Sequence, residues 1–162
     1  MSGLFSNTAP TWLVTKLERH LRTLQANPRD ADTAFDFFVT AESLVDWLLP
    51  GRENKQARRN LYDREPLLQV VSHIASGAKH YTVEAAHHKT VRSTRRTGGL
   101  FSGRLFAGRL HAGRLFPKGG LTIELDGQPA VLYGSIISAV AIAELILDRM
   151  KFLLAESNPG DA

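Results

Sequence analysis

Apolar residues recur at the three- to four-residue spacing of an amphipathic helix in four stretches of the chain. Asn27-Pro28 stops the first helix, and Asp30 or Asp32 can cap the second. The second stretch is apolar around most of its circumference, so this helix is expected at the centre of the fold. Pro66 suits the first position of the third helix. The predicted helices are Trp12–Leu24, Thr33–Leu49, Pro66–His80 and Ser135–Leu154.

The segments between these helices follow other patterns. Residues 52–65 are polar and mixed in charge, which predicts a connector with one helical turn at 56–60. Leu121–Leu125 alternates apolar and polar residues, Asp126-Gly127 is a two-residue turn signal, and Gln128–Tyr133 can return as a second strand. A β-hairpin over residues 121–133 is therefore predicted before the last helix.

A repeat precedes this hairpin. From Leu100 the sequence reads LFSGR-LFAGR-LHAGR-LF, with a glycine and an arginine in each five-residue unit. Glycine at this density disfavours a helix by about 1 kcal/mol per residue relative to alanine. An extended arm or loop is expected. The chain is predicted to be a single, mainly α domain over residues 1–162, with a helical body at 8–81 and 134–155 and an inserted basic arm at 89–118.

The basic character of the protein is concentrated in that arm. The chain carries 20 basic and 16 acidic residues, for a net charge of +4. Residues 89–118 contain eight cations and no carboxylate, so the rest of the chain has a net charge of −4. Such a segment attracts phosphate, an acidic protein surface or the acidic body of the same chain.

The composition and the absence of known sequence motifs exclude several classes of protein. The chain has no cysteine, so it can form neither a disulfide framework nor a cysteine-ligated metal site. It shows no signal peptide, no membrane-spanning run and no Walker, dinucleotide or nucleophile-elbow motif. We therefore expect a soluble cytoplasmic protein without cofactor or metal and without membrane contact.

Two groups of residues are candidates for acid–base chemistry. Gln69, His73, Ser76 and His80 lie along one polar stripe of the third predicted helix, so the two imidazoles share a face. The alternative is an ordinary solvated face. Glu42 and Asp46 lie one turn apart on the most apolar helix, where a nearby cation is expected. They could pair with Lys79 or His80, either as a structural lock or as acid–base partners of the histidine.

The basic segment carries the candidate binding residues. Its arginines alternate with phenylalanines that could stack on nucleic-acid bases. Its leucines equally suit packing on the body or on a second subunit, with the arginines on an acidic surface. The partner is thus RNA or DNA, an acidic protein or a second copy. The predicted binding residues are Lys79, Arg92, Arg95, Arg96, Arg104, Phe106, Arg109, Arg114, Phe116 and Lys118.

Two helical segments resemble a family of small uncharacterised bacterial proteins related to HEPN domains. The segments are Phe37–Trp47 and Ser72–Tyr81, the latter with its Gly-Ala-Lys-His sequence, and the family's Leu-Asp-Gly hairpin corresponds to Leu125–Gly127. The resemblance covers residues 30–155. It implies an antiparallel four-helix bundle that is often a homodimer.

HEPN ribonucleases place an arginine before a catalytic histidine, with four to six residues between the two. For His80 that arginine would stand at residues 73–75, which are His73, Ile74 and Ala75, so the motif is not matched. Imidazole lacks the forked, permanent charge of guanidinium. The resemblance thus implies a non-catalytic protein that acts through its basic arm. The alternative is a metal-independent ribonuclease, in a toxin or defence setting, that uses His80 and His73.

Overall fold

A computed structural model describes residues 9–79, 90–98 and 119–157. Among the predicted site residues, His80 and the arm residues from Arg104 to Lys118 lie outside these ranges, as does the side chain of Lys79. The elements are α1 (Pro10–Ala26), α2 (Ala31–Leu48), α3 (Lys55–Arg64), α4 (Pro66–Lys79), β1 (Val91–Gly98), β2 (Gly119–Leu125), α6 (Gly127–Tyr133), β3 (Ile136–Ser138) and α7 (Ala139–Ser157).

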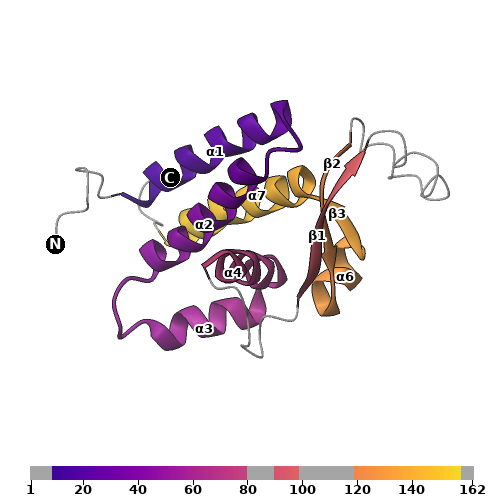
Figure 1. Ribbon diagram of the computed structural model, residues 1–162. Helices are drawn as coiled ribbons and strands as arrows, with labels where there is room; N and C mark the ends of the chain where they lie inside the picture. Colours follow the sequence, from indigo (N-terminus) through magenta and orange to yellow (C-terminus); the bar gives the residue numbers. More distant parts are fainter. Residues whose placement is uncertain (1–8, 80–89, 99–118, 158–162) are drawn as a thin grey trace.

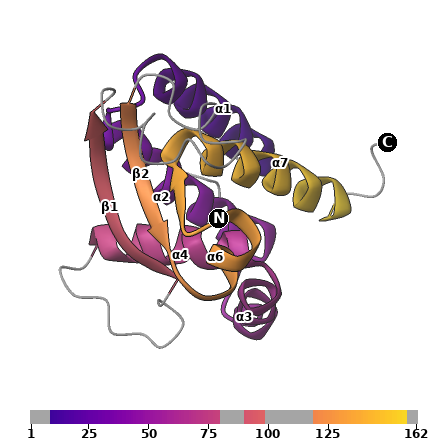
Figure 2. The same cartoon turned by 90° about the vertical axis from the view of Figure 1, so that its right-hand side faces the viewer.

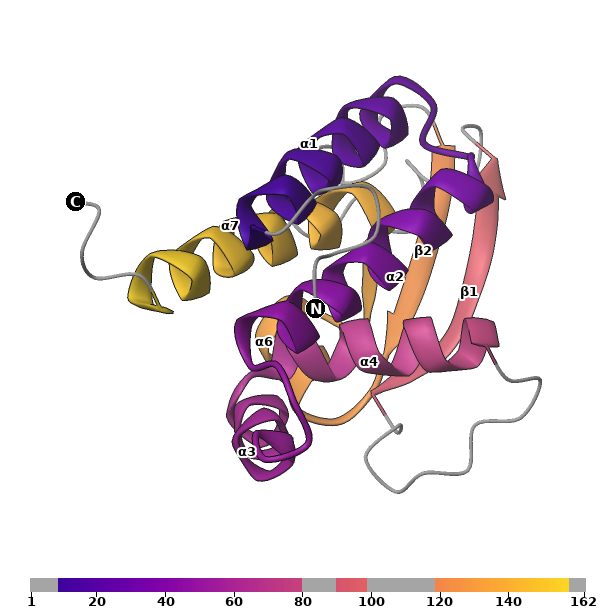
Figure 3. The same cartoon turned by 90° about the vertical axis from the view of Figure 1, so that its left-hand side faces the viewer.

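Helix α2 lies at the centre of the helical part, which confirms the prediction from its apolar circumference. It contacts α1, α4 and α7, as Figure 3 shows. Phe37, Ala41 and Leu44 on α2 are completely buried. Asp30 caps the helix, because its carboxylate accepts hydrogen bonds from the backbone N–H groups of Asp32 and Thr33.

The segment between α2 and α4 is more ordered than the sequence predicts. Instead of a connector with one helical turn, it forms the ten-residue helix α3. This helix is stable in spite of its polar composition because Leu61 is buried and Tyr62 packs against the hydrophobic core. Pro66 begins α4, as predicted.

A three-stranded antiparallel sheet in the order β1-β2-β3 completes the fold. Helices α2 and α4 lie on one side of this sheet (Figure 1), and α6, which follows β2, contacts α4, β2 and β3. Ile123, Leu125 and Ile137 of β2 and β3 are buried in the common core. The N–H of Leu121 donates to the carbonyl oxygen of Pro28 at 2.8 Å, which joins β2 to the loop between α1 and α2.

The predicted hairpin over residues 121–133 is wrong in its second half. Leu121–Leu125 is a strand, but Gly127–Tyr133 forms helix α6 (Figure 2). The side chain of Asp126 accepts from the N–H of Gly127 at 2.9 Å and so caps a helix instead of closing a turn. The strand partners of β2 are β1 and β3, and α7 consequently begins at Ala139, after the predicted Ser135.

The first part of the predicted basic arm belongs to the folded body. Val91–Gly98 forms β1 and pairs along β2 from Val91↔Leu125 to Gly98↔Gly119, with a bulge between Val91 and Ser93. The described chain is therefore mainly helical, as predicted; its small antiparallel sheet contains the predicted strand at 121–125, but the sequence pattern did not indicate the partner strands β1 and β3.

Candidate functional site

The imidazole of His73 anchors β1 to α4. Its Nδ1 atom accepts hydrogen bonds from the backbone N–H groups of Thr90, at 3.1 Å, and Val91, at 3.0 Å. The Thr90 hydroxyl also donates to the carbonyl oxygen of Gln69 on α4 at 3.3 Å. An Nδ1 atom that accepts two amide protons carries none itself. His73 thus holds the start of the strand, which is a structural task.

The polar stripe on α4 is therefore not a simple solvated face. Gln69, the next residue of the stripe toward the N-terminus, donates from Nε2 to the carbonyl oxygen of Tyr62 at 3.0 Å. The stripe connects α4 to α3 through Gln69 and to β1 through His73. The predicted pairing of His73 with His80 lies partly outside the described residues.

Asp46 has its expected cation, but this cation is Arg58 of α3. The Nε atom of Arg58 lies 3.4 Å from Oδ1 of Asp46. The same guanidinium donates to the carbonyl oxygens of Leu49 and Gly51, just after the end of α2. An arginine that satisfies the last carbonyls of a helix stabilises that end. This contact supports the structural lock between helices.

Tyr62 of α3, which lies near Glu42 and Asp46 of α2, has a perturbed pKa. Burial raises the pKa of the Tyr62 hydroxyl far above its usual value, and the negative charges of Glu42 and Asp46 raise it further. The phenol of Tyr62 is therefore neutral at physiological pH. Glu42 and Asp46 lie on the α3 side of α2, where they act on Tyr62 and Arg58.

The three described arginines of the basic segment lie in β1 and differ in their partners. Arg92 pairs with Asp126, at 2.9 Å between Nη2 and Oδ2, and lies 3.6 Å from Glu124. This pair raises the pKa of the Arg92 guanidinium, mainly through its hydrogen bond to Asp126. Arg95 and Arg96 are exposed and form no ion pair within the ranges that the structure describes, and the charge of Arg96 contributes to lowering the pKa of the Asp30 carboxyl.

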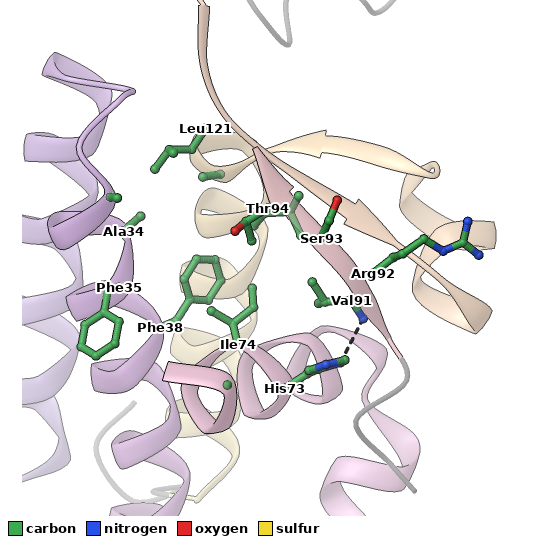
Figure 4. A pocket seen from close by; sticks show the side chains of 14 residues that line it. Ala34, Phe35, Phe38, His73, Ile74, Val91, Arg92, Ser93, Thr94 and Leu121 are labelled. Atoms are coloured by element: carbon green, nitrogen blue, oxygen red, sulfur yellow. Dashed lines mark hydrogen bonds between the residues drawn. The ribbon is translucent and has the colours of Figure 1, made fainter. Parts of the chain in front are cut away.

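A cavity of about 620 Å³ opens between α2, α4 and the sheet. Figure 4 shows Phe38 of α2 and Ile74 of α4 directed into it, with Thr94 of β1 across from them and Arg92 pointing away. Gly77 also lines the cavity, so the last turn of α4 contributes no side chain at that position, in contrast to His73 and Ile74 of the same helix. We call this cavity, with its border along β1, the β1 groove. No local sequence pattern indicates this groove, because the elements that form its walls are distant in the chain.

A second cavity, of about 520 Å³, lies between α3 and α4. Lys55, Arg58 and Arg59 line it from α3, and Gln69 and Ser72 line it from α4. Asp63 also lines it, so the cavity is a second basic surface, with a net positive charge, outside the basic segment at 89–118. Because Arg58 already binds Asp46 and two carbonyl oxygens, Lys55 and Arg59 carry most of the charge that this surface offers to a ligand.

Within residues 9–79, 90–98 and 119–157, no group of three or more histidine, cysteine or acidic side chains could hold a metal ion. No helix in these ranges combines the length and the apolar character needed to cross a bilayer.

Comparison with known proteins found no matching family model, no matching curated protein and no matching solved structure.

Proposed function

We propose that the protein is a non-catalytic binding protein that holds a negatively charged partner through the basic segment beginning in β1. The observation that carries this proposal is the position of Arg95 and Arg96, which are exposed at the end of β1 and form no ion pair within the described ranges. Residues outside the basic segment have a net charge of −4 and would repel the same partner. Electrostatic attraction therefore favours binding at this segment.

The HEPN-like interpretation remains part of the proposal. It expects α1, α2, α4 and α7 to form an antiparallel bundle, and the contacts of α1, α4 and α7 with α2 are compatible with that arrangement. The hydrogen bonds of His73 disfavour the ribonuclease alternative, because an imidazole that accepts two backbone N–H groups at the start of β1 is poorly placed to bind phosphate. A homodimer through the basic segment stays a prediction.

The test is charge reversal in β1 against an equal change elsewhere. Fluorescein-labelled poly-L-glutamate and a labelled uridine homopolymer serve as anionic probes, with anisotropy measured from about 50 to about 300 mM salt. Arg95→Glu/Arg96→Glu should weaken the binding of whichever probe binds by about tenfold or more. Lys55→Glu/Arg59→Glu makes the same change in net charge at the second basic surface and should change binding by less than about twofold. Equal losses in both variants, or no binding of either probe, would contradict the proposal.

The contribution of the repeat can be separated from that of the strand. Gly98 and Gly119 are paired in register, so residues 99–118 can be replaced by an Asn-Gly turn without moving β1 or β2. This variant should retain the helical circular dichroism of the parent and lose the partner or dimer contacts that the repeat makes. Its mass in solution at low and high salt tests self-association. RNA cleavage that His80→Ala abolishes, in a protein that still folds, would instead support the ribonuclease alternative.

A further inference from the structure

The outer edge of β1 is open among the described strands. The sheet order places β1 at one edge, paired with β2 alone. Alternate residues of an edge strand direct their N–H and C=O groups away from the sheet, where another strand can pair with them. At about 3.3 Å per residue, the eight residues of β1 offer roughly 26 Å of such edge. His73 fixes its beginning, because it binds the N–H groups of Thr90 and Val91.

The β1 groove lies against one face of β1 and β2 and offers apolar surface. Phe38 and Ile123 form buried parts of its lining, while Phe35 is 42% exposed. Its volume lies within the range of cavities that hold ligands in proteins. On the α4 side, Gly77 contributes no side chain next to Ile74. A chain that pairs with β1 would place every second side chain toward this groove.

The charges of β1 indicate which peptide fits. Arg95 is paired with Thr122 and Arg96 with Leu121, so the two arginines lie on opposite faces of the sheet. Arg96 is on the face of the β1 groove, since Leu121 also lines that cavity. Arg95 is on the opposite face of the sheet. The side chains of an added strand that do not point toward the groove would point toward this face. Acidic residues in that set would complement Arg95.

We propose that β1 accepts an extended acidic peptide of another protein as an added fourth strand, with its apolar residues in the β1 groove and its acidic residues on the opposite face of the sheet, beside Arg95. Backbone hydrogen bonds to an edge strand supply affinity in such complexes, and alternate side-chain pockets supply specificity. The inference rests on the proposed function, because the same arginines attract the partner, and it defines the chemistry and conformation of that partner.

The probe is the fluorescein-labelled peptide Glu-Val-Glu-Val-Glu-Val-Glu. A second peptide has the same composition with its valines and glutamates in separate blocks. Two further peptides carry N-methyl groups on either the glutamate or the valine amides. Because only alternate N–H groups of an added strand face β1, one N-methylated peptide should bind at least about tenfold more weakly and the other should bind like the parent. The block peptide should also lose about tenfold or more.

Variants of the protein test the groove and the charge separately. Gly77→Leu fills the open side of the groove and replaces a helical glycine, so it should fold at least as well and bind the alternating peptide at least about tenfold more weakly. Ala57→Leu adds the same side chain at an exposed position of α3 and should bind normally. Arg95→Glu/Arg96→Glu should weaken binding, whereas Lys55→Glu/Arg59→Glu should not.

The outcomes distinguish this inference from the function on which it rests. If poly-L-glutamate or RNA binds through Arg95 and Arg96 but the alternating peptide does not, strand addition is overturned and the basic binding surface stands. Equal binding of both N-methylated peptides, or normal binding to Gly77→Leu, also overturns strand addition. If charge reversal in β1 affects no probe, both proposals fail.

Discussion

Replacing the acceptor atom of His73 should destabilise the protein measurably. His73→Phe keeps an aromatic ring and removes Nδ1, which accepts the N–H groups of Thr90 and Val91. Thr90 is 6% exposed, so water replaces the lost acceptor poorly. An unsatisfied buried donor costs about 1–3 kcal/mol. Because His73 and Val91 are only half-buried, we use the low end of this range for each of the two amides. We expect the free energy of unfolding to fall by about 2 kcal/mol, which is a large share of the 5–15 kcal/mol typical of a domain.

The matched control is His73→Asn. The Oδ1 atom of asparagine can occupy the position of the imidazole Nδ1, so this variant keeps an acceptor for the two amides and should lose at most half as much stability. Urea unfolding followed by circular dichroism measures both variants, and hydrogen exchange at Thr90 and Val91 reports the local effect. In His73→Phe these two amides should exchange faster. Equal stability of the wild type and His73→Phe would refute the anchoring role.

Three further predictions concern stability. Gly120→Val should lower the free energy of unfolding by about 1–3 kcal/mol, because an added Cβ would lie 3.1 Å from Cβ and O of Pro28, and an unchanged urea midpoint would contradict this packing. Hydrogen bonds from the Thr33 side chain and backbone lower the pKa of the Asp30 carboxyl, so its stabilisation is present above the unfolded value near 4 and is lost as pH falls through the folded pKa. Asp30→Ala should therefore flatten the acid limb of thermal stability below about pH 4, and an unaltered limb would count against the cap. Burial, followed by the charge of Lys16, lowers the pKa of His20, whose Nε2 is buried without a hydrogen-bond partner in the described ranges. The folded state thus binds a proton at His20 less readily than the unfolded state does, and stability should fall as pH drops below about 6.5. His20→Leu should reduce this dependence of stability on pH, and a melting temperature with the same pH dependence as the wild type would disprove the assignment.

The long helices could be predicted because their signals are local. The leucines at positions 13, 17, 21 and 24 of α1 lie at helical spacing and are buried, and Pro28 follows the end of that helix. The centrality of α2 follows equally from its composition. The extent of α3 was missed because its buried residue, Leu61, lies in an otherwise charged segment.

The sheet could not be predicted in the same way. Asp126-Gly127 suits both a hairpin turn and a helix start, but Pro129 at the third position of α6 favours a helix, since proline is tolerated in a first turn and poorly tolerated inside a strand. Residues of β1 such as Arg95 and Arg96 show no apolar alternation. This strand forms through pairing with β2, which is distant in the sequence, and that pairing leaves no local pattern.

The candidate site was predictable only in part. The basic character of β1 is visible in the sequence, and so is the need of Asp46 for a cation. The identity of that cation, Arg58, depends on where α3 packs against α2. The function of His73 as an acceptor for two backbone amides likewise depends on the position of β1, which no spacing within α4 reveals.

The register of β1 and β2 has a consequence for how this sequence can vary over evolutionary time. Gly98 and Gly119 face each other as strand partners, so the chain leaves and re-enters the sheet at one point. Duplication or deletion of a five-residue unit between them would leave every pairing of the sheet in place, and the entropic cost of a longer connection grows only with the logarithm of its length. We therefore expect the number of units to differ among close relatives, while the residues that flank the insertion stay constant.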